Sequence, residues 1–191
     1  VQVLADDAWS DWSDWHAFEV GLLDRSEWAG AFIGLAGDGR DLGRRGERGA
    51  IHLRRRFVVD DVPVRARLRA TALGLYELHL DGVRVGDLEL TPGFTAYRST
   101  LEAQTHDVTD LLAPGEHELV ATLTDGWYRG SVGFTREELS FGERLGLLAQ
   151  LELVGPDGAL TVTPTDLSWE ASTRSPILAA DLIEGERLDG G

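Results

Sequence analysis

Two short stretches of this 191-residue sequence carry the side chains best suited to binding chemistry. In "TDGWYRG" (124–130) a Trp-Tyr-Arg run follows an Asp-Gly turn, and in "TPGFTAY" (91–97) two aromatic residues follow a Pro-Gly turn. Aromatic rings beside a turn can stack on the apolar C–H face of a sugar, while Asp and Arg side chains can bind its hydroxyl groups. The candidate carbohydrate-binding residues are therefore Phe94, Tyr97, Asp125, Trp127, Tyr128 and Arg129.

A second interpretation of the same aromatic residues is that they close one end of a hydrophobic core. Packing is the commoner role of large aromatic side chains. The two interpretations differ in exposure, because open rings around a groove favour binding and buried rings favour packing. Trp169, in "LSWEAST", is assigned to the core, and Asp107 is assigned to a helix cap rather than to a metal site.

The sequence lacks the residues and motifs that most kinds of enzymatic chemistry require. There is no cysteine, which excludes disulfides, thiolate zinc sites and a cysteine nucleophile. There is no lysine for a GxxxxGK phosphate loop, and neither HExxH nor GxSxG occurs. The five histidines lack metal-ligand spacing, and His79 and His117 are expected to be solvated strand residues. The 33 acidic residues could include a glycosidase-type pair, but a sequence does not give the separation of two carboxylates.

The charge and hydropathy of the chain bear on its partners. The net charge of −15 makes nucleic acid a poor partner, since phosphate binding needs a basic surface. The one basic stretch, residues 40–56, is balanced by Asp38, Asp41 and Glu47, and a solvated loop and strand are expected there. No apolar run of about 20 residues is present, so no membrane span is expected. Because the chain starts at Val1 and lacks methionine, it is interpreted as an excised piece, which leaves its compartment open.

Short alternating runs from about residue 51 predict the elements that position the candidate residues. "ARLRATA" (66–72), "LYELHLDG" (75–82), "HELVATLTDG" (117–126) and "RLGLLAQLEL" (144–153) place apolar side chains at every second position. Period two indicates half-buried strands, and Asp-Gly and Pro-Gly pairs between the runs indicate turns. The predicted fold is all-β: an antiparallel, jelly-roll-like β-sandwich of the galactose-binding-like kind.

The remaining segments are assigned from composition. Residues 36–50, "AGDGRDLGRRGERGA", hold five glycines and few apolar residues, so a flexible Gly/Arg loop is expected. Helix is expected to be minor. "DVTDLL" (107–112) predicts one short helical turn with Asp107 as its N-cap.

An ordered set of stretches resembles a known family. These are "GLLDRSEW", "LRRRFVV", "ALGLYELHLDGVRVGD", "LTPGFTAYRS", "THDVTDLLAPGEHEL", "TDGWYRGSVGF", "GERLGLLAQLEL", "TDLSWEAS" and "DLIEGERLD". Together they resemble the N-terminal β-sandwich domain of bacterial α-L-rhamnosidases. The resemblance covers about residues 51–189 and extends back to 21–28, so residues 21–191 are predicted to form that domain. The sequence departs from the common pattern at Asp81, where Asn-Gly hairpins are frequent, and at Phe94, where Trp is usual.

The resemblance implies a multidomain glycoside hydrolase that removes terminal L-rhamnose with inversion. Its catalytic carboxylates would lie in a separate, later α/α toroid, so no catalytic residue is assigned in this chain. Some related sandwich domains bind rhamnose with calcium. Calcium is therefore a candidate cofactor, although no metal ligands can be matched here position by position.

The stretch "WSDWSDW" (9–15) places a tryptophan at every third residue. On a strand Trp9 and Trp15 would share one face and Trp12 would take the other. In the resembled family a fibronectin-like domain often precedes the sandwich, and its final strand has a similar tail. Residues 1–20 are accordingly interpreted as a remnant strand of a preceding fibronectin-III-like domain, or as a linker. An orphan strand of this kind could also pair two copies of the chain.

These observations bear on three functions. The sandwich captures rhamnose-containing glycans through Trp127, Tyr128 and their neighbours, or it packs against the missing catalytic domain without sugar affinity of its own. Enzymatic activity within this chain has no supporting nucleophile, metal set or motif. Exposure of Trp127 and Phe94 is the feature that separates the first two.

Overall fold

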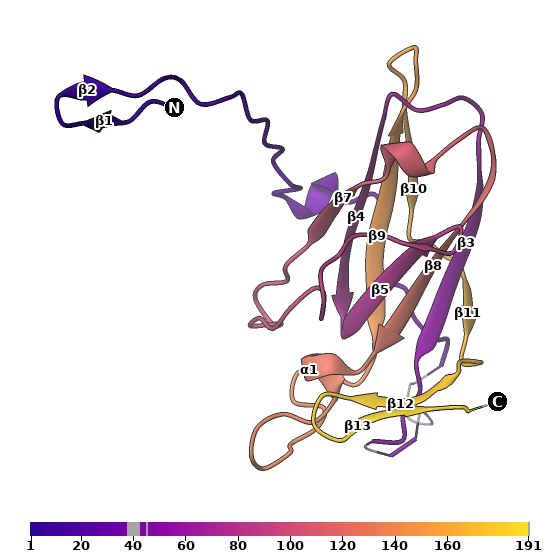
Figure 1. Cartoon of the computed structure of the whole chain (residues 1–191). Coiled ribbons are helices and arrows are strands. Elements are labelled where there is room, and N and C mark those ends of the chain that lie inside the picture. Colours follow the sequence, from indigo (N-terminus) through magenta and orange to yellow (C-terminus); the bar gives the residue numbers. More distant parts are fainter. Residues whose placement is uncertain (38–42, 45, 191) are drawn as a thin grey trace.

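The computed structural model describes residues 1–37, 43, 44 and 46–190. Two antiparallel sheets pack face to face (Figure 1). The five-stranded sheet has the order β11 (Glu170–Ser172), β3 (Ile51–Val59), β8 (Gly115–Thr124), β5 (Leu75–Leu80) and β6 (Val83–Arg84). The four-stranded sheet has the order β10 (Leu160–Pro164), β9 (Gly146–Val154), β4 (Arg65–Leu73) and β7 (Gln104–Asp107). The prediction of an all-β antiparallel sandwich is confirmed.

Helix is minor in the described part of the chain. It consists of α1 (Gly126–Arg129) and two 3-10 turns, η1 (Arg25–Glu27) and η2 (Thr109–Leu111). The turn η2 forms where it was expected, and Oδ1 of Asp107 accepts the Thr109 N–H at 3.0 Å. The residue in the cap position is Val108 rather than Asp107. None of these helices is long and apolar enough to cross a membrane.

The core lies between the two sheets and is built by the alternating runs. The pairings of β3 with β8 and of β4 with β9 each extend over nine residues, which fixes the register of the inward side chains. Those side chains are almost completely buried, and among the largest are Leu53, Leu68, Leu78, Leu119, Leu123, Leu147 and Leu151. Trp169 is partly buried and packs against this core, as the sequence predicts.

Residues 19–35 form a covering segment along the four-stranded sheet: its first part lies over the outer face, and Ile33 pairs with the edge of β9 and packs against the core. The backbones of Ile33 and Leu147 form a bridge, and the Ala31 N–H donates to the Thr165 carbonyl at 3.0 Å. The Ala29 N–H donates to Oε1 of Gln150 at 2.8 Å. Gln150 is therefore only 2% exposed although it lies on the outer face of its strand. The alternating pattern predicts solvent on this face, and the N-terminal segment takes its place.

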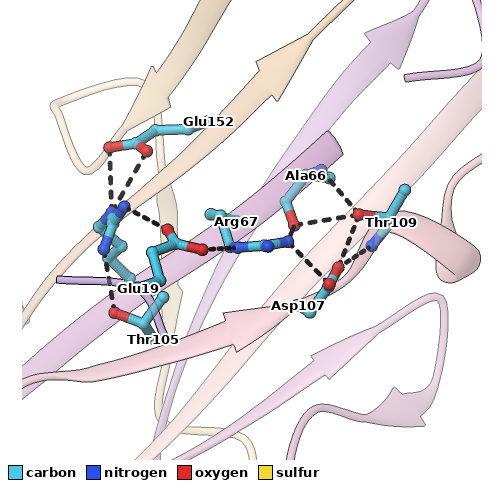
Figure 2. A network of polar contacts seen from close by, with 8 residues as sticks. Glu19, Ala66, Arg67, Thr105, Asp107, Thr109 and Glu152 are labelled. Carbon is cyan, nitrogen blue, oxygen red and sulfur yellow. Dashed lines mark hydrogen bonds and ion pairs between the residues drawn. The ribbon is translucent and has the colours of Figure 1, made fainter. Parts of the chain in front are cut away.

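Glu19 fixes the beginning of this covering segment (Figure 2). Its carboxylate accepts from Nε of Arg67 at 2.6 Å and from Nη2 of Arg69 at 2.9 Å. The two arginines are held in turn by Asp107, at 2.8 Å from Arg67, and by Glu152, at 3.2 Å from Arg69. Because Arg67 and Arg69 both lie on β4, this network joins the N-terminal segment to the sheet.

Residues 1–18 extend away from the sandwich as an arm (Figure 1). They include a short hairpin of β1 (Leu4–Ala5) and β2 (Ala8–Trp9). Trp9, Trp12 and Trp15 are 65%, 74% and 101% exposed, so these rings form no part of the core of this chain. The assignment of residues 1–20 to a preceding domain or linker, and their pairing with a second copy, stay predictions.

His117 and Arg48 are also buried where the sequence predicts solvent. His117 is 9% exposed because its ring stacks on Phe57 and contacts Asp81. Arg48, in the segment interpreted as a flexible loop, is 7% exposed and makes an ion pair with Asp125. Of the expected loop 36–50, residues 38–42 and 45, and with them the acidic partners Asp38 and Asp41, lie outside the described residues.

Candidate functional site

The candidate site is built on one helical turn at the end of β8. The sequence predicts an Asp-Gly turn here, and the chain instead forms α1, which begins at Gly126. Gly126 has φ +52° and packs so closely that a Cβ would lie 2.5 Å from Cγ of Leu75, so only glycine fits without strain. The Arg129 N–H donates to the Asp125 carbonyl at 3.2 Å, and the turn places Trp127 and Tyr128 beside the 91–97 loop.

Five aromatic rings meet at this end of the sandwich. Ring centroids are 5.8 Å apart for Phe94 and Trp127 and 5.3 Å apart for Tyr97 and Tyr128. Phe141 completes the group, at 6.0 Å from Phe94 and 5.0 Å from Tyr97. We call Phe94, Tyr97, Trp127, Tyr128 and Phe141 the aromatic platform. The edge-to-face and tilted angles are those that ring quadrupoles favour.

The platform has a buried base and an open top. Tyr97 is 8% exposed, and its hydroxyl donates to the Gly93 carbonyl at 3.0 Å. Burial raises the pKa of both Tyr97 and Tyr128. Phe94 is 57% exposed although it contacts three other rings, whereas Trp127 and Tyr128 are half-buried. Four of the five platform residues were candidates from the sequence.

Phe141 was missed by sequence reasoning. It lies in the irregular segment between α1 and β9, where no periodicity marks a side chain as near or far from the site. The Phe141 N–H donates to the Tyr128 carbonyl at 3.4 Å, which brings its ring back over α1. A single large aromatic residue beside Gly142 in a polar segment is the only signal that the sequence offers.

The two charged candidates do not stand free beside the rings. Asp125 and Arg129 are each 2% exposed, and Nε of Arg129 donates to Oδ1 of Asp125 at 2.7 Å. Nε of Arg48 donates to the other oxygen, Oδ2, at 2.5 Å. The spacing of four residues between Asp125 and Arg129 is the usual spacing of an ion pair on one helical turn. These side chains hold α1 in place, and their groups point to each other.

Burial and charge act in opposite directions on the two arginines. For Arg48, burial alone would lower the pKa, but hydrogen bonds and charge from Asp125 and Glu138 raise it above its usual value. For Arg129, burial lowers the pKa, and the nearby Asp125 offsets only part of that effect. Two cations thus share one buried carboxylate, with Glu138 as the second anion.

A cavity of about 490 Å³ lies beside the platform, on the outer face of the four-stranded sheet. Thr71 and Leu148 belong to that sheet, and Trp28 and Phe32 belong to the covering segment. Tyr97 lines this cavity and also belongs to the platform, so the two are contiguous. The next residues of the same loop, Arg98, Ser99 and Thr100, give the cavity a polar side.

A larger hollow of about 790 Å³ lies among Val1 and residues 12–16 of the arm, but its tryptophans are largely exposed and no wall belongs to the sandwich. Within the described residues, no group of three or more His, Asp or Glu side chains is arranged to hold a metal ion. Calcium binding stays a prediction.

The fold and the site define this chain as an antiparallel β-sandwich domain with an open aromatic platform at one end. A family model described as the α-L-rhamnosidase N-terminal domain matches residues 61–191. The chain belongs to this family. An α-L-rhamnosidase of Formosa agariphila is 33% identical over 189 residues, which are 96% of this chain and 20% of that protein. One of Streptomyces avermitilis is 42% identical over 170 residues, which are 87% of this chain and 16% of that protein.

Solved structures agree with this assignment. The native α-L-rhamnosidase of Aspergillus terreus matches with a TM-score of 0.87 and 37% identity, over 95% of this chain and 21% of that one. The Streptomyces avermitilis enzyme complexed with L-rhamnose matches with a TM-score of 0.69 and 45% identity, over 72% of this chain and 13% of that one. A Pleurotus ostreatus lectin, at 19% identity and a TM-score of 0.50, shares the fold alone. This chain therefore spans about a fifth or less of the rhamnosidases that it resembles.

Proposed function

We propose that this chain is a non-catalytic accessory domain of a multidomain α-L-rhamnosidase, and that its aromatic platform binds the glycan substrate. The parent enzyme would hydrolyse terminal L-rhamnose from glycosides, with its catalytic carboxylates in another domain. One observation carries the binding role: Phe94 is 57% exposed at the top of a cluster whose base is buried. The exposed ring adjoins Tyr97, Trp127 and Phe141, and a contiguous aromatic surface of this kind is what favours a binding site.

The platform has the surface that sugar recognition needs. A hexose presents an apolar C–H face that stacks on an aromatic ring, and its hydroxyl groups then need a few polar partners. Phe94 and Trp127 supply adjoining rings at 5.8 Å. Arg98 and Thr100 supply polar side chains in the cavity on the other side of Tyr97. A terminal sugar on Phe94 and Trp127 could thus extend across Tyr97 toward polar partners.

A structural role without sugar affinity is the second candidate. It is favoured by the burial of Asp125 and Arg129, because the two charged groups nearest to Trp127 in sequence bind each other instead of a ligand. In that role the aromatic end of the sandwich would pack against the catalytic domain. The two candidates make opposite predictions for the isolated chain, which would bind sugar only in the first.

The test is a calorimetric titration of the 191-residue chain with L-rhamnose, with and without calcium. Saturable heat would support a carbohydrate-binding domain, and heat that saturates only with calcium would add a metal to the site. A folded sample that gives no heat in either condition would refute the binding role and leave the structural one. Fucose and galactose are suitable control sugars because they share the hexose ring and differ in hydroxyl stereochemistry.

A further inference from the structure

The turn that carries two platform rings is held at both ends by distant parts of the chain. At its start, Nε of Arg48 donates to Oδ2 of Asp125 at 2.5 Å, across 77 residues of sequence. After its end, the Ser131 N–H donates to Oδ2 of Asp181 at 2.8 Å, across 50 residues. Trp127 and Tyr128 lie between these two attachments. An isolated helix of one turn is not stable, so its position depends on such tertiary contacts.

Arg48 also reaches the third platform segment. Its Nη1 and Nη2 each donate to Oε2 of Glu138 at 3.1 Å, and Nη2 donates to the Arg129 carbonyl at 3.3 Å. Glu138 lies three residues before Phe141 in the same irregular segment. One guanidinium group therefore contacts α1 and the segment that supplies Phe141, which are two of the three sources of platform rings.

The backbone around Arg48 is fixed on β12 (Ile177–Asp181), which pairs with β13 (Gly185–Leu188). The Ala180 N–H donates to the Arg48 carbonyl at 3.2 Å, and the Ala50 N–H donates to the Ile177 carbonyl at 3.1 Å. Asp181, which holds the other end of α1, belongs to the same strand. Both attachments of α1 thus converge on β12, and Figure 1 shows the β12–β13 hairpin directly beside α1.

We propose that Arg48 is a positioning residue for the aromatic platform. It fixes α1 and the Phe141 segment in one arrangement, so that Trp127 and Tyr128 meet the rings of the 91–97 loop. A planar guanidinium with five donors can bind two carboxylates and a carbonyl at once, and a lysine ammonium in its place lacks that fork geometry. The sugar-binding part of this inference rests on the proposed function, and the geometric part does not.

The test compares Arg48→Met with the unchanged chain at a temperature where both are folded. Titration with L-rhamnose is expected to show about tenfold weaker binding, because the rings would have to be ordered on binding instead of being preorganised. In proton NMR spectra, the contact between the Tyr97 and Tyr128 rings is expected to be lost or weakened. Arg54→Met is the matched control. Arg54 lies on β3 of the five-stranded sheet, is 40% exposed and pairs with Glu118 and Glu170.

A second variant keeps the test decisive if Arg48→Met does not fold. Glu138→Gln removes only the outer partner of Arg48 and leaves the buried Asp125–Arg129 pair intact. It is expected to weaken the same ring contact while the sandwich stays folded. The proposal is overturned if the folded variants keep the ring contacts and the affinity and lose only thermal stability. Should the unchanged chain not bind L-rhamnose, the proposed function fails, and the ring contacts alone still decide the role of Arg48.

Discussion

The imidazole Nδ1 of His117 lies 2.6 Å from Oδ2 of Asp81, in the turn between β5 and β6. Its other nitrogen, Nε2, lies 2.6 Å from the Ala113 carbonyl oxygen. A carboxylate and a carbonyl accept hydrogen bonds, so this geometry favours the doubly protonated, cationic form of the imidazole. The ring stacks on Phe57 with centroids 5.6 Å apart.

This pair makes the stability of the sandwich depend on pH. Burial alone would lower the pKa of His117, but the Ala113 carbonyl and the Asp81 carboxylate raise it above its usual value. A pKa that is higher in the folded state gives stability that is full below about pH 6.5 and is lost as the pH rises through the folded value. We expect the melting temperature to fall as the pH rises above about 6.5 and through the raised pKa of folded His117. In His117→Gln that fall should be absent; an equal fall in the variant would contradict the assignment.

The network around Glu19 predicts a local rather than a global effect. The hydrogen bond from Arg67 holds the pKa of Glu19 below its usual value, so its stabilisation is present at neutral pH and lost in acid. Glu19→Gln should speed amide hydrogen exchange in residues 19–24 and change the free energy of unfolding by less than about 1 kcal/mol. Glu186→Gln, on exposed β13, is the control. Unchanged exchange at 19–24 would show that the segment is held by its other contacts.

The platform predicts a separation between affinity and stability. Phe94→Ala and Trp127→Ala remove open or half-buried rings, so under the proposed function each should abolish L-rhamnose binding with little loss of stability. If the rings only close the core, Trp127→Ala should instead cost about 3–5 kcal/mol of unfolding free energy. Calorimetric titration and urea denaturation of the same samples distinguish the two results.

The glycine beside the platform gives a steric test. A Cβ on Gly142 would lie 2.0 Å from the Tyr128 hydroxyl oxygen, so Gly142→Ala must displace Tyr128 or the loop. We expect a changed near-ultraviolet circular dichroism spectrum and weaker sugar binding. Gly21→Ala is the matched control, because nothing lies within 4 Å of the added Cβ. Identical spectra for both variants would mean that the loop adapts without moving the ring.

The core predicts the largest losses of stability. Leu123 on β8 is completely buried, and Leu123→Ala should lower the free energy of unfolding by about 3–5 kcal/mol through lost burial and a cavity. Leu167 is 100% exposed, and Leu167→Ala should change it by no more than about 0.5 kcal/mol. Urea denaturation measures both changes. The comparison requires that the slope of the unfolding free energy against urea concentration is the same in each variant and in the unchanged chain. A small loss at Leu123 would mean that the neighbouring side chains collapse into the space.

The strands could be predicted from sequence because their information is local. Leu68, Leu78 and Leu123 lie inward in the structure as the period-two pattern predicts, since each strand has one face toward the core. The burial of Arg69 and Gln150 could not be predicted in this way. It depends on the covering segment 19–35, which has no regular period and finds its place only in the assembled sandwich.

The candidate site was predicted in composition and only partly in arrangement. The aromatic residues of two stretches distant in sequence do meet, and the contact of Phe94 with Trp127 confirms that they share one end of the fold. The sequence predicts Asp125 and Arg129 as ligand anchors because they flank the rings. Their spacing of four residues was the overlooked signal, since one helical turn brings such side chains together as an ion pair.

The layer formed by residues 19–35 bears on how this sandwich can be transplanted. The family match begins at residue 61, inside the turn after β3. A graft cut at that point would lack β3 and the covering layer, so it would open the five-stranded sheet, leave the edge of β9 at Leu147 unpaired and expose apolar surface around Leu148. Such a graft would be prone to aggregate. A transferable sandwich therefore begins no later than Glu19.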